Sequence, residues 1–129
     1  MEAFHFINAF CLNCVTAYDQ TNRIEFLYLA NRIYSLHTGG LDEDEEQIIC
    51  INQMQILKRL TGSLTIEQTK ELMQMKRNTD NEQLDFCTSV LLGGTLEAQT
   101  IFEGFPDQIK EAYKEYPIYR LYKEQLPTN

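Results

Sequence analysis

The stretch DEDEEQIICINQMQILKRLTG, residues 42–62, contains the signals for both ends of one helix. Asp42 and Glu45 have the spacing of a capping box, in which each side chain accepts a hydrogen bond from the other residue's backbone N–H. Gly62 tolerates the left-handed conformation that ends many helices, and the two basic residues before it complement the negative end of the helix dipole. Residues 48–51 alone would also fit a strand. The length of the pattern, from cap to glycine, favours a helix.

The same pattern of starts and stops recurs along the chain. Three more pairs have the spacing of a capping box, and three more stops contain glycine or asparagine. The predicted starts are Asn22-x-x-Glu25, Thr65-x-x-Gln68 and Asp80-x-x-Gln83, and the predicted stops are Gly39-Gly40, Asn78 and Gly93-Gly94. Four consistent pairs of start and stop predict a series of capped helices.

Apolar side chains recur at helical spacing within each predicted helix. The first helix carries such a stripe, made of Phe4, Ile7, Cys11, Cys14 and Tyr18. Pro106 suits the first turn of the last predicted helix, which Pro117 then interrupts. The linkers are short and nothing is of low complexity, which favours a single domain. We therefore expect one all-α domain over residues 1–129, with about five to seven short helices stacked as antiparallel hairpins.

The chain is acidic, and its carboxylates are concentrated near the beginning. The net charge is −8, and residues 1–46 contain eight acidic and two basic side chains. Such a chain repels phosphate backbones and anionic lipid, so nucleic acid and membranes are disfavoured as partners. A protein with a basic surface suits this charge better. The acidic run at residues 42–46 fits a first helical turn, because it lacks the alternating ligands and the glycine of a calcium loop.

The four cysteines do not form a metal-binding pattern. Cys11 and Cys14 have CxxC spacing but lie on the apolar stripe of the first helix, where we interpret them as small buried hydrophobes. Cys50 and Cys87 are isolated, so no four-ligand zinc set is present. The beginning of the chain lacks the basic segment of a signal peptide, and no stretch has the ~20 apolar residues of a membrane span. We expect a cytoplasmic protein with free thiols and without metal or cofactor.

The stretch Leu91-Leu92-Gly93-Gly94-Thr95-Leu96-Glu97-Ala98-Gln99-Thr100-Ile101-Phe102 resembles the turn and second helix of a tetratricopeptide-type repeat. In such a repeat a small residue, here Ala98, lets two helices approach, and an aromatic residue one turn later, here Phe102, fills the gap. The resemblance covers about one repeat, Leu91–Phe105, with no second copy at a fixed period. The segment Tyr116–Tyr119 is similar to the ends of small uncharacterised bacterial helical proteins. The first resemblance implies helical hairpins, and neither resemblance names an activity or a ligand.

Arg32 and His37, separated by four residues, resemble the motif of HEPN-class ribonucleases, which are small all-α domains. The resemblance implies that His37 acts as general acid and base and that Arg32 binds phosphate at a dimer cleft. On one continuous helix these side chains point about 140° apart, so the helix would have to end near His37, as Gly39 permits. Ile33 departs from the polar residue often found there. The alternative is a solvated Arg32 and a helix-terminal His37.

Four tyrosines lie within ten residues near the end of the chain: Tyr113, Tyr116, Tyr119 and Tyr122. They are interleaved with basic residues, a mixture that suggests base stacking in a basic protein. Residues 107–129 have no net charge, so we expect the tyrosines to pack a terminal helix onto the body with their hydroxyls reaching water. The alternative is an exposed protein-recognition patch, because tyrosine is frequent at interfaces.

The sequence contains no phosphate-binding glycine loop, zinc-protease motif or nucleophile elbow, and no carboxylate pair stands out as a general acid and base. We therefore expect a non-enzymatic protein–protein interaction module, with an immunity- or antitoxin-type neutraliser of a basic toxin as one concrete form. The alternative is a HEPN-like ribonuclease that uses Arg32 and His37. A small-molecule site between the hairpins has no polar cluster to mark it.

Overall fold

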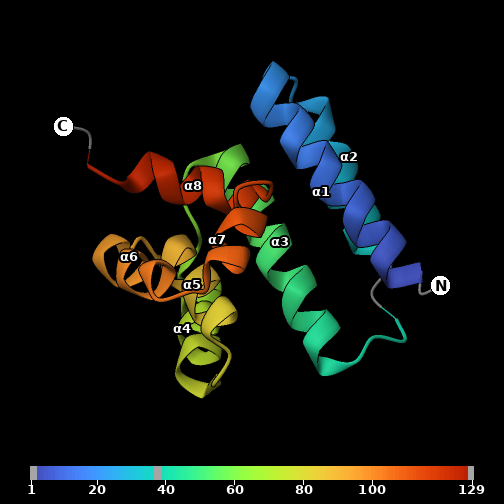
Figure 1. Cartoon of the computed structure of the whole chain (residues 1–129). Coiled ribbons are helices and arrows are strands. Elements are labelled where there is room, and N and C mark those ends of the chain that lie inside the picture. Colours follow the sequence, from blue (N-terminus) through green and yellow to red (C-terminus); the bar gives the residue numbers. More distant parts are fainter. Residues whose placement is uncertain (1–2, 37–38, 128–129) are drawn as a thin grey trace. The chain divides into compact units, whose positions relative to one another are not determined.

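The chain is all-helical over the residues that its computed structural model describes, 3–36 and 39–127 (Figure 1). The described residues contain eight helices and no strand, which confirms the all-α prediction and exceeds the expected five to seven helices by one. The helices are α1 (Ala3–Thr21), α2 (Glu25–Leu36), α3 (Glu43–Thr61), α4 (Ile66–Asn78), α5 (Glu82–Leu92), α6 (Thr95–Glu103), α7 (Asp107–Tyr113) and α8 (Pro117–Gln125). The strand alternative for residues 48–51 is wrong, because these residues lie within α3.

The residues group into two compact units, Met1–Ser63 and Leu64–Asn129. Unit 1 contains α1, α2 and α3, and unit 2 contains α4 to α8. The single domain expected over residues 1–129 stays a prediction.

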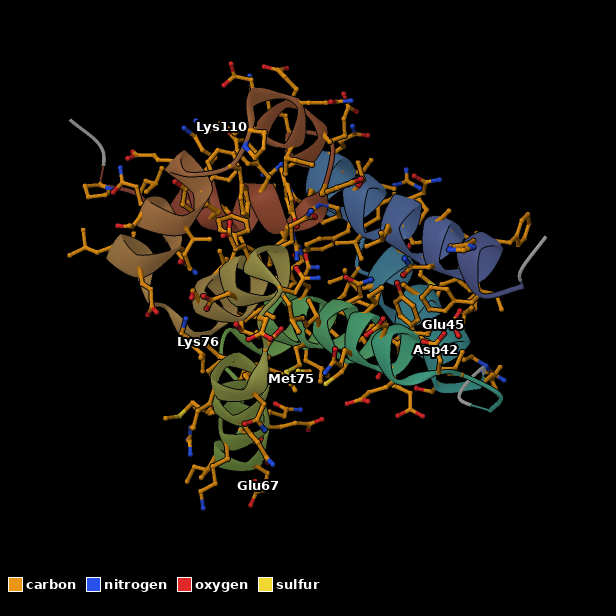
Figure 2. The ribbon with its side chains drawn as sticks, turned by 60° about the horizontal axis from the view of Figure 1, so that its bottom comes forward. Asp42, Glu45, Glu67, Met75, Lys76 and Lys110 are labelled. Carbon is orange, nitrogen blue, oxygen red and sulfur yellow. The ribbon has the colours of Figure 1, made fainter. Side chains whose placement is uncertain are left out.

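Two of the predicted capping boxes form with both hydrogen bonds. At the start of α3, Glu45 N donates to Asp42 Oδ1 at 2.8 Å and Asp42 N donates to Glu45 Oε1 at 3.1 Å. Figure 2 shows these two residues together at this helix start. Thr65 and Gln68 make the same reciprocal pair at the start of α4. These boxes satisfy backbone N–H groups that lack partners in the first helical turn, so local sequence is enough to position both starts.

The other two predicted starts are wrong in position. Asn22 has a φ of 60° and donates its backbone N–H to Tyr18 O at 2.7 Å, so it ends α1 and does not cap α2. At α5 the cap is Asn81, whose side chain accepts from Gln83 N and Leu84 N. Asp80 precedes it by one residue. An adjacent pair of good capping residues is ambiguous in sequence, and the turn geometry selects one.

Unit 1 is a three-helix arrangement in which α1 and α2 run side by side (Figure 1). The thiol of Cys11 on α1 lies 3.6 Å from Ala30 O on α2, at the middle of this hairpin. α3 runs parallel to α1, because the pair Asn8–Asn52 precedes the pair Asp19–Arg59 along both helices. Buried apolar residues of all three helices form the core: Cys11, Cys14, Val15, Leu27, Ala30, Tyr34, Ile49 and Ile56. The apolar stripe predicted for the first helix is therefore the core face of α1.

Unit 2 has α5 at its centre, packed against α4, α6 and α8. The Phe86 ring of α5 lies 5.1–5.8 Å from the rings of four residues, Phe102, Phe105, Tyr113 and Tyr122. On the α4 side, Lys76 Nζ bonds Ser89 Oγ at 2.8 Å and Glu97 Oε1 at 2.7 Å and also pairs with Asp85. Burial alone would lower the pKa of Lys76, but these carboxylates raise it. The ion pairs and the aromatic cluster therefore join four helices around α5.

Pro117 explains the additional helix. The sequence predicts that this proline interrupts the last helix, but in the structure it also begins α8 at its first position. A proline there loses no intrahelical hydrogen bond, because the first N–H groups of a helix have no partner within the helix. Between Tyr113 and Pro117 the backbone makes turns in place of a continuous helix.

Candidate functional site

An apolar surface lies on the side of α1 that points away from α3. Asn8 marks the α3 side, because its Oδ1 accepts a hydrogen bond from Asn52 Nδ2 at 2.8 Å. Phe6 and Phe10 lie two residues to either side of Asn8, and helix geometry points both about 160° away from it. Phe6 is 66% exposed and Phe10 is 39% exposed. Two large aromatic side chains of α1 therefore face away from the core of unit 1.

α2 contributes leucines to the same side. The Tyr34 hydroxyl donates to Asn8 Oδ1 at 2.6 Å, so Tyr34 marks the inner side of α2. Leu36 lies about 160° from Tyr34 around this helix and Leu29 about 140°. Leu29 is 43% exposed and Leu36 is 68% exposed. We call the surface formed by Phe6, Phe10, Leu29 and Leu36 the open face of the hairpin.

The surface of α1 is almost free of charge. Asp19 is the only Asp, Glu, Lys or Arg among its 19 residues. Its carboxylate makes two hydrogen bonds of 2.9 Å with the Arg59 guanidinium on α3, on the side away from the open face. A solvated helix face normally carries charged side chains, whereas a helix that is apolar on several sides is covered by other groups. The open face therefore lacks the charged side chains that are typical of a solvated helix surface.

Sequence reasoning missed the four residues of the open face, although part of the signal was available. Phe6 and Phe10 are four residues apart and lie off the predicted core stripe, in a segment without lysine or arginine. A second apolar stripe on one helix predicts a second contact. The convergence of α1 and α2 on one face could not be read from either helix alone.

A run of carboxylates occupies the first turn of α3, near the end of unit 1 where α2 finishes. Glu43, Asp44 and Glu46 are exposed beside the capping pair Asp42 and Glu45. None of the ion pairs found among the described residues involves these five carboxylates. The partial positive charge of a helix N-terminus favours them there, and their outward negative charge stays available to a cation.

The structure describes one residue of the predicted ribonuclease pair, Arg32. Arg32 lies on α2 with an exposed side chain, between Leu29 and Leu36 on the outer margin of the open face. His37 lies outside the described residues. The structure describes α2 as far as Leu36. The catalytic assignment of the pair stays a prediction.

The structure divides the four predicted tyrosines between core and surface. Tyr113 and Tyr122 are buried, and both pack edge-on against Phe86. The Tyr113 hydroxyl donates to Gln83 Oε1 at 3.0 Å. Tyr119 is partly buried against Phe102, and Tyr116 is exposed. Packing accounts for Tyr113 and Tyr122, and the role of Tyr116 and Tyr119 in recognition stays a prediction.

A shallow depression of about 300 Å³ lies on α4 and is lined by Lys70, Met73, Gln74, Arg77 and Asn78. All five residues belong to this one helix, so the depression is a groove along its surface. A ligand site between hairpins would need walls from at least two helices. This groove is therefore not the predicted small-molecule site between hairpins, which stays a prediction.

Burial favours the neutral form of three cysteines, Cys11, Cys14 and Cys87. Burial and the neighbouring Cys14 raise the pKa of the Cys11 thiol from 9.0 to about 12. Burial likewise raises the pKa of Cys14, and it raises that of Cys87 to about 12 against the opposing effect of a hydrogen bond with Tyr113. No group of three metal-ligating side chains occurs among the described residues. Thiolate chemistry at neutral pH is therefore disfavoured at these positions.

We expect Cys11, Cys14 and Cys87 to react with a thiol reagent at pH 8 on the order of 100-fold more slowly in the native chain than in the unfolded chain. All four cysteines should react rapidly in guanidinium chloride. Above about pH 9 the thiols of the unfolded chain lose protons that the native chain keeps, so the free energy of unfolding should fall as the pH rises toward 12. Rapid oxidation of Cys11 and Cys14 in the native chain would contradict this prediction.

Known proteins add no further constraint on this site. No described helix has the length and apolarity needed to cross a membrane. Comparisons with protein-family models, with curated proteins and with solved structures found no match to this chain.

Proposed function

We propose that the protein is a non-enzymatic protein–protein interaction module, and that unit 1 carries its binding surface. The open face of the hairpin supports this proposal, because it exposes Phe6, Phe10, Leu29 and Leu36 on a side of unit 1 that α3 does not cover. Contiguous apolar surface on a folded chain commonly marks an interaction site. The helical hairpins provide the rigid support that such a surface requires.

The partner that we propose has a basic surface. The acidic first turn of α3 supports this choice, because Glu43, Asp44 and Glu46 are exposed at one end of unit 1. Charges at the rim of an interface mainly increase the association rate and exclude wrong partners, while the apolar centre supplies most of the affinity. A cytoplasmic immunity- or antitoxin-type neutraliser of a basic toxin is one concrete form of this function. Repeat-like stacking of the hairpins is the architecture that we propose for it.

The function is tested by capturing proteins from a native lysate at low salt with the tagged full chain. We expect a stoichiometric protein partner, which moderate salt weakens because rim charges are screened. Leu36→Glu should lose this partner, since a carboxylate in an apolar interface is costly to desolvate. Leu96→Glu, at an exposed leucine of α6, is the matched control and should retain it. Recovery of no stoichiometric protein, either another copy of this chain or a different one, would overturn the proposal.

The basic character of the partner is tested by neutralising the acidic turn. Replacing Glu43 and Glu46 by glutamine and Asp44 by asparagine leaves the capping pair intact, and we expect it to weaken capture by about tenfold. Neutralising three exposed carboxylates of unit 2, Glu103, Glu115 and Glu124, changes the net charge equally and should leave capture unchanged. Equal weakening in both variants would show a general charge effect and would contradict a specific basic contact.

A further inference from the structure

We infer that the open face of unit 1 is filled by a second copy of this chain, so that two α1–α2 hairpins pack together in a symmetric dimer. This inference rests on the proposed function in one respect, that the open face is an interface. It adds the identity of the occupant. The basic partner of the proposed function then contacts the dimer at the acidic turns of α3, and Leu36→Glu removes this partner by breaking the dimer that presents both turns.

The exposed apolar area fits a dimer interface of ordinary size. A fully exposed side chain of this size has an area of roughly 200 Å². The exposed fractions of the four residues of the open face then sum to about 400 Å² of apolar surface. A standard interface buries roughly 800 Å² on each partner, and a little more than half of this area is apolar. The open face therefore supplies close to the whole apolar centre of one side of such an interface.

The exposed residues of α1 carry no charged side chain, and this favours a second copy of the chain as the occupant of the open face. These exposed residues are His5, Phe6, Ala9, Phe10, Asn13, Gln20 and Thr21, and none is an Asp, Glu, Lys or Arg. A basic partner would find no opposite charge along this helix. A two-fold interface places the same patch on both sides, so an uncharged apolar patch is complementary to itself.

The acidic turn selects the direction of pairing. Asp42–Glu46 lies at the end of unit 1 where α1 begins, because α1 and α3 run parallel. A two-fold axis perpendicular to the hairpin places these turns at opposite ends of the dimer, about 28 Å apart along a 19-residue helix. Carboxylates at this separation are largely screened from each other at physiological ionic strength. Parallel pairing would place the two acidic ends side by side, where they would repel.

Arg32 is compatible with this arrangement because it lies at the margin of the open face. Its position between Leu29 and Leu36 lets the aliphatic part of the side chain cover apolar surface while the guanidinium stays in water. Unit 1 already has one side of the α1–α2 hairpin covered by α3. A second hairpin on the other side gives the four helices of two copies a shared apolar centre.

The dimer is tested by measuring the molar mass of the purified full chain with light scattering during size exclusion. At about 100 µM, a hundredfold above a micromolar dissociation constant, we expect twice the 15.1 kDa of one chain. Phe10→Glu and Leu36→Glu should each weaken the dimer by about 100-fold or more. Ile66→Glu and Leu96→Glu, at the exposed apolar positions of α4 and α6, are matched controls and should stay dimeric. Circular dichroism identifies any variant that fails to fold.

The other possible results distinguish a failure of the dimer from a failure of the proposed function. A monomeric wild-type chain at this concentration removes the self-association, and if Leu36→Glu still abolishes capture of a different protein, the proposed function survives. A monomer that binds neutral phospholipid vesicles through Phe6 and Phe10 would assign the face to a lipid surface. Dimers that persist in both face variants would place the contact elsewhere. A dimer that captures no other protein supports the inference and overturns the proposed basic partner.

Discussion

Replacing Phe86 by alanine lowers the free energy of unfolding by about 3–5 kcal/mol. Phe86 is fully buried, and its ring contacts four aromatic rings contributed by α6, α7, α8 and the turn after α6. Alanine at this position leaves a cavity that all of these elements line, so none can fill it without moving another. The loss therefore combines the transfer energy of the ring with the cost of the cavity.

Thermal unfolding followed by circular dichroism measures this loss, which we expect as a fall in Tm of roughly 10 °C or more. Leu96→Ala is the control, because Leu96 is 77% exposed on α6 and should change the free energy of unfolding by less than about 0.5 kcal/mol. Phe86→Leu keeps most of the volume and should cost less than Phe86→Ala. Similar Tm values for the Phe86→Ala and Leu96→Ala variants would contradict the central position of Phe86 in unit 2.

Replacing Asp19 by alanine destabilises the chain by about 3–5 kcal/mol. The Asp19 carboxylate accepts hydrogen bonds from Arg59 Nε and Nη2 at 2.9 Å each. The Asp19 side chain is 10% exposed and the Arg59 side chain is 5% exposed. Without the carboxylate, the guanidinium keeps its charge in a site with little water. The loss reflects this buried charge more than the strength of the ion pair.

The double variant Asp19→Leu with Arg59→Met separates these two contributions. It removes both charges and keeps much of the apolar volume, so we expect it to recover most of the stability lost in Asp19→Ala. Chemical denaturation gives the free energy for each variant. Glu111→Ala is the control for an exposed pair, Lys114–Glu111, and should leave the free energy of unfolding nearly unchanged, because water screens this pair. A double variant as unstable as the single one would show that Arg59 stabilises unit 1 through other contacts.

The positions of helix starts show how far local sequence can predict this fold. The boxes at Asp42 and Thr65 form as expected, because the groups that pair are three residues apart and need no other part of the chain. At Asn22 the same type of residue ends the preceding helix, and at residues 80–81 the second candidate is the cap. These two positions depend on the turn that joins two helices, and tertiary packing decides that turn.

The candidate site was less predictable than the fold. Arg32 could be named from a spacing, but Phe6, Phe10, Leu29 and Leu36 form a surface only because α1 and α2 pack antiparallel with α3 on one side. The predicted tyrosine patch divides for a similar reason. Tyr113 and Tyr122 enter the cluster around Phe86, a residue of another helix.

The sequence alone determined that this chain forms helices, where several of them begin and end, which side of α1 is buried, and that its beginning is acidic. Each of these properties depends on residues within one or two helical turns. The tertiary structure alone decided which apolar residues stay outside the core, which tyrosines are buried, and that Asp19 finds Arg59 forty residues away. Those outcomes depend on how separate helices pack against each other. Hydrophobic burial is non-directional, so many packing arrangements bury similar apolar area. Side-chain shape and hydrogen-bond partners then select one arrangement.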